Sequence, residues 1–236
     1  MSPVRLTPGE ARRALYVDFE GRKVGPPVLL GCTTKSRVRS RLSVWQAVTD
    51  PILTPLAIAD DIEALSLADA VERILVRAER KDRLIVAWSE RELDVVREHC
   101  PQHLDRFEAR FRNAREFAVR WRNKCHDGRR PPTNALADYL ALIGYTVPEG
   151  AGPGRVGETV EIVQRVLLRG RRVSDLTDKQ LRRWDDLREH NRHDCAGMRR
   201  ITILAADEIA EEDRRAQRSS RLARKPRLLR SRAGAA

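Results

Sequence analysis

The alternation of apolar and polar residues divides the chain into a strand-rich first half and a helical second half. Two apolar runs, at residues 13–19 and 26–34, have the pattern of buried strands, and residues 41–50 alternate as a half-exposed strand does. Glycine, proline and serine between these segments favour turns, which predicts an antiparallel three-strand meander. The apolar run at 82–89 predicts a fourth strand, and "EFAVRW" at 116–121 predicts a short fifth strand.

Helical periodicity dominates most of the remaining chain. The segment 65–80 carries apolar residues at helical spacing, and a second helix is predicted at 89–99, with Ser89 as a potential N-cap three residues before Glu92. Further helices are predicted at 133–144, 157–170 and 177–217. A meander, a helix and then strand–helix–strand are typical of an α/β fold of the ribonuclease H-like type. In such a fold helices flank a mixed sheet, and here the C-terminal half is helical.

Positive charge is concentrated at the C-terminus. The 236-residue chain has a net charge of +12, and residues 214–232 contain nine Arg or Lys residues and no acid. Without these nine charges the rest of the chain would carry only +3. We therefore expect residues 1–213 to form a single ribonuclease H-like domain, and residues 214–236 to form a disordered basic tail that is attracted to polyanions. The tail residues expected to contact nucleic acid are Arg221, Arg224 and Lys225.

The sequence contains no segment with the character of a membrane-spanning helix. No run of about eighteen apolar residues occurs, and the N-terminal segment lacks the apolar centre of a signal peptide. A cytoplasmic location is therefore predicted. The four cysteines are irregularly spaced and include no C-x-x-C pair, so we expect free thiols rather than disulfides or a zinc site.

Four acidic residues and one histidine are the candidates for chemistry. Asp18 and Glu20 are two residues apart on the first strand, so their side chains point to the same face. Glu92 lies in the first turn of the helix that follows the fourth strand. His190 and Asp194 are four residues apart and share one face of the last helix. If the first and fourth strands are neighbours, these side chains meet near one edge of the sheet.

A cluster of carboxylates of this kind is a typical binding site for Mg²⁺ or Mn²⁺. Two such ions, about 3.5–4 Å apart, stabilise both the attacking and the leaving oxygen during a displacement at phosphorus. A histidine beside them can take a proton from the attacking water near neutral pH. The acidic cluster therefore predicts a two-metal site for phosphodiester hydrolysis.

Three segments resemble the motifs of the DEDD-type 3′–5′ exonucleases, in particular the bacterial ribonuclease H-like nuclease domains. "YVDFEG" at 16–21 is similar to their first motif, in which a hydrophobic residue precedes D-x-E. "LIVAWSERELDVV" at 84–96 is similar to the second motif and "HNRHDCAGMRRI" at 190–201 to the third. "TNALADYLALIGY" at 133–145 is similar to the segment before the third motif. The resemblance covers residues 14 to 205 and excludes the basic tail.

The resemblance implies a metal-dependent exonuclease that uses two Mg²⁺ or Mn²⁺ ions to remove nucleotides from the 3′ end of single-stranded DNA or RNA. By this resemblance Asp18 would contact both ions, and Glu20 and Asp194 would hold the ion that activates water. Glu92 would support the second ion, and His190 would act as the general base. The expected partners are single-stranded nucleic acid and a helicase or another nucleic-acid-processing protein.

Two departures from the family pattern leave residue assignments open. Many members have an aspartate where this chain has Glu92, and Glu90 and Asp94 are also available as the acid of the second motif. The histidine subclass places its base five residues before the last aspartate, whereas His190 stands four residues before it. His193 therefore stays open as the alternative base.

A third departure concerns how a nucleotide is gripped and what the protein does. "AWS" replaces the His-Asn pair usual in the second motif, and Trp88 within it is expected to stack on a terminal base. The alternative function is a catalytically weak or inactive nucleic-acid-binding module that uses the basic tail. A recruitment factor acting through the tail alone is a third hypothesis.

Overall fold

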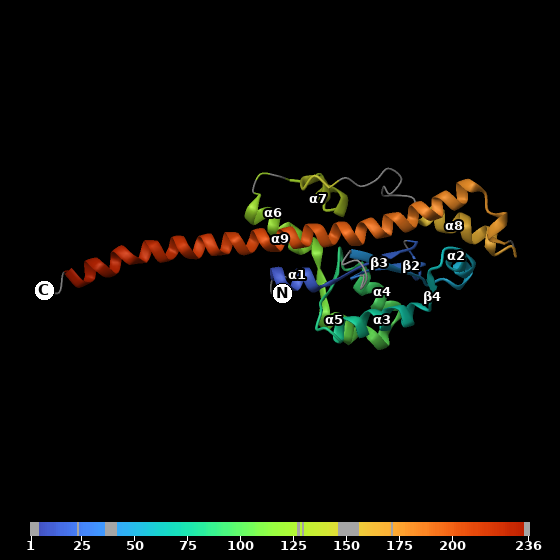
Figure 1. Cartoon of the computed structure of the whole chain (residues 1–236), viewed down its shortest axis with the longest axis horizontal. Helices are drawn as coiled ribbons and strands as arrows, with labels where there is room; N and C mark the ends of the chain where they lie inside the picture. The colour runs from blue at the N-terminus through green and yellow to red at the C-terminus, as the bar shows by residue number, and fades with distance from the viewer. Residues whose placement is uncertain are drawn as a thin grey trace.

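In the computed structural model of the protein, a mixed β-sheet lies at the centre and helices cover both of its faces (Figure 1). The structure describes residues 5–22, 24–35, 42–126, 128, 130–145, 156–170 and 172–233. The side chains of residues 34, 35, 42 and 221–233 are outside this description. Within the described residues, none of the helices combines the length and the apolar character that crossing a membrane requires.

The described part of the sheet has six strands in the order β4-β3-β2-β1-β5-β6. Neighbouring strands are antiparallel from β1 to β3 and parallel elsewhere, which confirms the meander and places the predicted fourth strand, β5, beside β1. This order is compatible with a ribonuclease H-like sheet. The strands are β1 (Leu15–Glu20), β2 (Leu29–Lys35), β3 (Leu42–Val48), β4 (Glu63–Ala64), β5 (Ile85–Ala87) and β6 (Phe111–Asn113).

The prediction of a strand at 116–121 is wrong, because these residues lie in helix α6 (Ala114–Cys125). The side-chain oxygen of Asn113 accepts a hydrogen bond from the Glu116 amide at 3.2 Å and caps the helix. The buried residues Phe117 and Trp121 are four positions apart, which is helical spacing. Residues 111–113 form the last strand instead, immediately before this cap.

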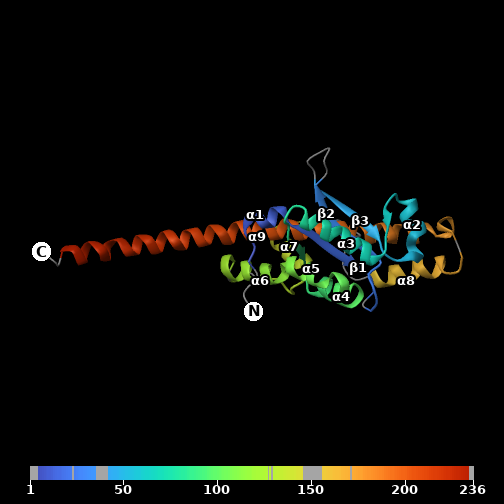
Figure 2. The same ribbon diagram turned by 90° about the horizontal axis from the view of Figure 1, so that it is seen from below.

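Side chains alternate between two apolar layers along β1. Tyr16 packs among α1 (Pro8–Arg13), α6, α7 (Leu136–Leu142) and α9 (Asp178–Ala233) on one face of the sheet. Leu15 and Val17 pack on the opposite face, against the layer of α3 to α5. The two views agree that α9 and the α3–α5 layer lie on opposite sides of the sheet (Figures 1 and 2). The helices of this second layer are α3 (Leu67–Glu79), α4 (Arg91–His99) and α5 (Leu104–Arg110).

A third apolar cluster joins the ends of β2 and β3 to α2 (Thr54–Ala59), α8 (Val156–Leu167) and the start of α9. Its largest member, Trp184, is fully buried, and its indole nitrogen donates a hydrogen bond to Asp60 at 2.7 Å. This cluster holds the N-terminal part of α9 against the sheet. Short 3-10 turns complete the fold at Pro51–Leu53, Pro101–His103 and Val173–Asp175.

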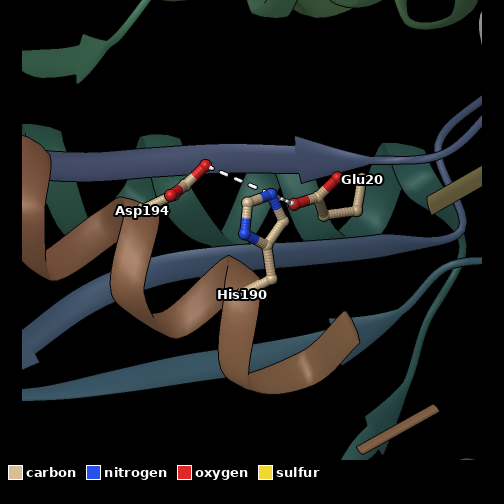
Figure 3. A group of neighbouring side chains, drawn as sticks. All are labelled: Glu20, His190 and Asp194. Atoms are coloured by element: carbon tan, nitrogen blue, oxygen red, sulfur yellow. Dashed lines mark ion pairs between the residues drawn. The ribbon is translucent and has the colours of Figure 1, made fainter. Parts of the chain in front are cut away.

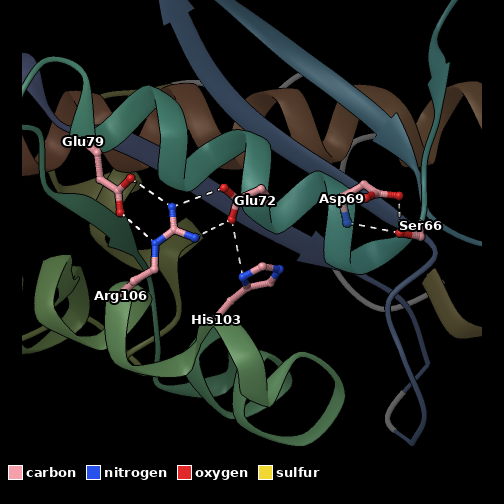
Figure 4. Close-up of polar contacts among 6 residues, drawn as sticks. All are labelled: Ser66, Asp69, Glu72, Glu79, His103 and Arg106. Carbon is pink, nitrogen blue, oxygen red and sulfur yellow. Dashed lines mark hydrogen bonds and ion pairs between the residues drawn. The ribbon is translucent and has the colours of Figure 1, made fainter.

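Ion pairs join α3 to α5 on the other side of the molecule (Figure 4). The guanidinium of Arg106 donates to Glu72 and to Glu79, and His103 lies 3.4 Å from the same Glu72 carboxylate. Arg106, Glu72 and Glu79 are thus paired within the layer. The network therefore belongs to the packing of the helices, and it lies on the face of the sheet opposite α9.

Helix α9 continues beyond the folded body as a projecting arm (Figure 1). The segment 214–233, for which the sequence predicts a disordered tail, is helical in the structure. The side chains of residues 213–220 in this arm are exposed. The division of the chain into a domain at 1–213 and a tail at 214–236 stays a prediction.

Candidate metal and active site

The first strand directs two carboxyl groups toward α9. Because side chains alternate along a strand, Asp18 and Glu20 share the face that α9 covers, whereas Phe19 packs into the opposite apolar layer. Glu20 is buried, with 8% of its surface exposed. The predicted orientation of this pair is confirmed by these contacts.

Helix α9 brings a histidine and a third carboxyl group to the same place. Nε2 of His190 lies 3.6 Å from Oε1 of Glu20 and 3.6 Å from Oδ2 of Asp194. Figure 3 shows the imidazole between the two carboxylates, one from β1 and one from the next turn of the helix. One ligand atom from each residue lies within 4.8 Å of the others, so these three side chains could hold a metal ion.

The second-motif region contributes Glu92 from the first turn of α4. Its side chain is buried, with 5% of the residue exposed, and the Ser89 hydroxyl donates a hydrogen bond to it at 3.3 Å. Helix α4 begins at Arg91 with Glu90 as its N-cap residue, so the prediction of Ser89 as the N-cap is wrong. The Ser89 hydroxyl is instead shared between the Arg91 amide and the Glu92 carboxyl group.

The two other acids of this region point elsewhere. Glu90 is exposed and accepts a hydrogen bond from Asn113 at 2.9 Å. Asp94 is 62% exposed and forms an ion pair with Arg97. Glu92, in contrast, is buried, and the negative charge of Asp18 raises its pKa. Geometry therefore favours Glu92 as the acid that belongs to the cluster.

Burial raises the pKa of every carboxyl group in the cluster, and repulsion by Asp18 adds to this for Glu20, Glu92 and Asp194. Loss of hydration and the negative charge of Asp18 raise the pKa of Glu92 to about 8 and that of Asp194 to about 7. Burial and the charges of Asp18 and Asp194 raise the pKa of Glu20 well above its ordinary value. Burial also raises the pKa of Asp18, against the charge of His190 and a hydrogen bond from Asn191.

The cluster has the character of a cation site. Asp18 lies within electrostatic reach of Glu20, Glu92 and Asp194, and burial disfavours ionising these carboxyl groups together. The positive charge of Arg91 lowers the pKa of Asp18, Glu20 and Glu92, and its guanidinium is tied to the Arg22 carbonyl oxygen at 2.8 Å. Two divalent ions would balance four ionised carboxylates, and hard oxygen ligands suit Mg²⁺ or Mn²⁺.

His193, the alternative base, has a different polar partner from His190. Nδ1 of His193 lies 3.1 Å from the Tyr145 hydroxyl, whereas Nε2 of His190 faces Glu20 and Asp194. Arg188, two residues before His190 on the same helix, is paired with Asp60 at 2.7 Å. Asp194 is paired with His190 at 3.6 Å, so His190 rather than His193 is the histidine grouped with Glu20 and Asp194.

The predicted nucleic-acid contacts are not part of the cluster. Trp88 follows β5, but its indole nitrogen donates to the Asn134 carbonyl oxygen at 3.0 Å and its ring meets Tyr139 edge to face. The indole is half-buried, and its stacking on a base stays a prediction. The side chains of the other three predicted contacts are outside the described part of the structure, namely Arg221, Arg224 and Lys225.

Sequence analysis missed Asn191, which is fully buried beside Asp18. Its amide donates to the carboxylate of Asp18 and accepts from Gln46 on β3. Two features of the sequence could have indicated this contact. They are an asparagine on the buried face of a helix and a glycine, Gly31, in the middle of a strand. Both features arise from the close approach of Asn191 to Gly31, two residues that are far apart in the chain.

No model of a known protein family matches this chain, and comparisons with curated proteins and with solved structures give no match either. The resemblance to the exonucleases therefore depends on the three motifs and on the arrangement of the side chains that these motifs contribute.

Proposed function

We propose that the protein is a metal-dependent 3′–5′ exonuclease of the DEDD type that acts on single-stranded DNA or RNA. The observation that supports it is the convergence of Glu20, His190 and Asp194, with ligand atoms within 4.8 Å of one another. The negative charge of Asp18 raises the pKa of Glu20 and Asp194, and it also raises the pKa of Glu92. Glu20 and Asp194 from the first and third motif segments, with Asp18 acting on Glu92 of the second, support metal-assisted phosphoryl chemistry at this place.

In the proposed reaction the carboxyl groups would bind the metal ions, and His190 would transfer a proton. Asp18, Glu20, Glu92 and Asp194 would hold two Mg²⁺ or Mn²⁺ ions, which supply charge stabilisation at phosphorus and a nucleophilic hydroxide when bound. The imidazole of His190 lies against the carboxylates of Glu20 and Asp194, where it can accept a proton from the attacking water. Burial of the carboxyl groups limits their solvation and strengthens their interaction with a cation.

The test is the degradation of a 5′-labelled single-stranded oligonucleotide in the presence of Mn²⁺ or Mg²⁺. We expect a ladder of products that keep the 5′ label and shorten from the 3′ end, and we expect a chelator to stop the reaction. The Asp18→Ala variant, purified in the same way, controls for contaminating nucleases. Degradation that persists with the chelator, or that is equal in the variant, would contradict the proposal.

The second candidate function is a nucleic-acid-binding module that uses the basic arm, with little or no hydrolysis. The exposed side chains of Arg214, Arg215 and Arg218 on the projecting part of α9 favour it. Metal binding separates the two candidates, because a module without catalysis needs no uptake of Mn²⁺ at Asp18. A chain that binds nucleic acid but takes up no Mn²⁺ would favour this second function.

Removal of residues 214–236 is expected to weaken binding to a single-stranded oligonucleotide at least about tenfold at roughly 0.1 M salt, because each basic contact displaces counterions from the strand. The slope of log affinity against log salt is expected to become shallower. Fluorescence anisotropy over a salt series measures both quantities, and thermal unfolding checks that residues 1–213 stay folded. An unchanged salt slope would show that the arm does not contact the strand.

A further inference from the structure

Asn191 stands between the two cluster residues of α9 and has no exposed surface. Its Nδ2 donates to the main-chain oxygen of Asp18 at 3.0 Å and to Oδ2 of the same residue at 2.8 Å. We propose that Asn191, oriented by Gln46 and seated over Gly31, is a positioning residue that fixes the Asp18 carboxylate for divalent-cation binding. The inference rests on the function proposed above.

The orientation of the Asn191 amide follows from a chain of obligatory donors and acceptors. The carbonyl oxygen of Arg188 can only accept, so the Gln46 group that faces it at 2.8 Å is the amide nitrogen. That same nitrogen lies 3.0 Å from Asn191, which must therefore present its oxygen, Oδ1, to Gln46. The donor group of Asn191 is then left to face Asp18.

The sheet provides the space for this amide through one glycine. Asp18, Gly31 and Gln46 are paired across β1, β2 and β3, so they form one row across the sheet. A Cβ atom built on Gly31 would lie 2.2 Å from Oδ1 of Asn191 and 2.8 Å from its Cγ. Any side chain larger than hydrogen at this position would displace the amide and break its hydrogen bonds on both sides.

The role assigned to Asn191 is indirect, since a fully buried side chain cannot touch a substrate. Two hydrogen bonds to one residue hold both the backbone and the carboxylate of Asp18, which limits the rotation of that carboxylate. Outer-shell partners of this kind orient the groups that bind the metal, and their loss typically lowers affinity about 10–100-fold. Asn191 would act through Asp18 on the cation.

Titration of the full-length protein with Mn²⁺, by calorimetry or by electron paramagnetic resonance, tests the inference without an activity measurement. We expect Asn191→Ala and Gly31→Ala each to weaken Mn²⁺ binding about 10–100-fold. The double variant is expected to bind no more weakly than Asn191→Ala alone, because alanine at 191 removes the atoms that the added methyl group meets. Effects that multiply would show that the two residues act independently.

Gly197→Ala is the matched control on the same helix. Its added methyl group would lie 2.6 Å from Cδ1 of Leu140, which can move without the loss of a hydrogen bond. We expect Mn²⁺ affinity within about twofold of the wild type in this variant. Circular dichroism and thermal unfolding establish that each variant is folded before titration. If Asn191→Ala does not fold, the Mn²⁺ affinity of folded Gly31→Ala tests the positioning role instead.

The outcomes separate the inference from the proposed function. If the wild-type protein does not bind Mn²⁺, the proposed function fails and the inference fails with it. If the wild type binds Mn²⁺ and folded Asn191→Ala binds it equally well, only the positioning role is overturned. A loss of affinity in Gly197→Ala as large as that in Gly31→Ala would also overturn it, because general disturbance of α9 would then account for the effect.

Discussion

Asp18→Ala is expected to reduce Mn²⁺-dependent hydrolysis by at least about a thousandfold. Asp18 is the residue whose charge reaches Glu20, Glu92 and Asp194, so its removal takes away the carboxylate common to the whole cluster. Metal ions supply several kcal/mol of transition-state stabilisation, and a tenfold change in rate corresponds to about 1.4 kcal/mol. Initial rates on a labelled oligonucleotide at saturating Mn²⁺ measure the effect.

The matched control for this substitution is Asp94→Ala. Asp94 is an acid of the same region that lies on the surface and pairs with Arg97, away from the cluster. We expect its rate to stay within about twofold of the wild type. A large loss in Asp94→Ala, with activity retained in Glu92→Gln, would show that Asp94 is the acid of the second motif.

Glu92→Gln is expected to stabilise the metal-free protein at pH 8 and to lower its nuclease activity about a hundredfold or more. Burial and the charge of Asp18 raise the pKa of Glu92 from its ordinary value of 4.5 to about 8. In the folded protein the carboxyl group keeps its proton up to about pH 8, whereas the unfolded chain loses it near pH 4.5. The folded state therefore binds more protons in this range, and stability falls as pH rises through it.

One pKa unit corresponds to about 1.4 kcal/mol. The difference between the pKa of Glu92 in the folded and in the unfolded chain therefore limits the gain in the free energy of unfolding to about 5 kcal/mol at pH 8. Glutamine removes the ionisation and can keep the hydrogen bond from Ser89. The gain in the free energy of unfolding is expected to shrink below about 1 kcal/mol at pH 5. Urea denaturation with a chelator at both pH values measures the gain.

Glu90→Gln is the control for the stability effect, because the same chemical change falls on an exposed residue two positions away. Its free energy of unfolding should change little at either pH. Mn²⁺ should stabilise the wild type most at pH 8, where the carboxylates ionise as the cation binds, and should stabilise Glu92→Gln less. A Glu92→Gln variant no more stable than the wild type at pH 8 would contradict the raised pKa of this group.

Most strands of the first half were predictable from short apolar runs bounded by turn residues, and the strand at 41–50 was predictable from its alternation. Asp18 and Glu20 could be placed on one face because side chains alternate along a strand, and the structure directs both toward α9. His190 and Asp194 could be placed together because residues four apart share a helix face, and the structure has them 3.6 Å apart.

The acid of the second motif could not be chosen from the sequence. Glu90, Glu92 and Asp94 are spaced by two residues at the start of a helix, and a shift of one residue in that start rotates each side chain by about 100°. The structure begins α4 at Arg91, which turns Glu92 inward and leaves Glu90 and Asp94 exposed. The segment 116–121 was assigned to a strand for a related reason, because a short apolar run has no unique period.

Local patterning by itself determined that Asp18 shares a strand face with Glu20 and that His190 shares a helix face with Asp194, together with the meander and the helical second half. Only the tertiary structure decided that α9 lies across β1, that Glu92 rather than its neighbours turns inward, and that Asn191 rests on Gly31. The physical reason is the separation along the chain between the residues that are in contact. Periodicity reports the contacts of a residue with its own element, whereas the Asn191 contacts join residues 145 and 173 positions apart, which only packing brings together.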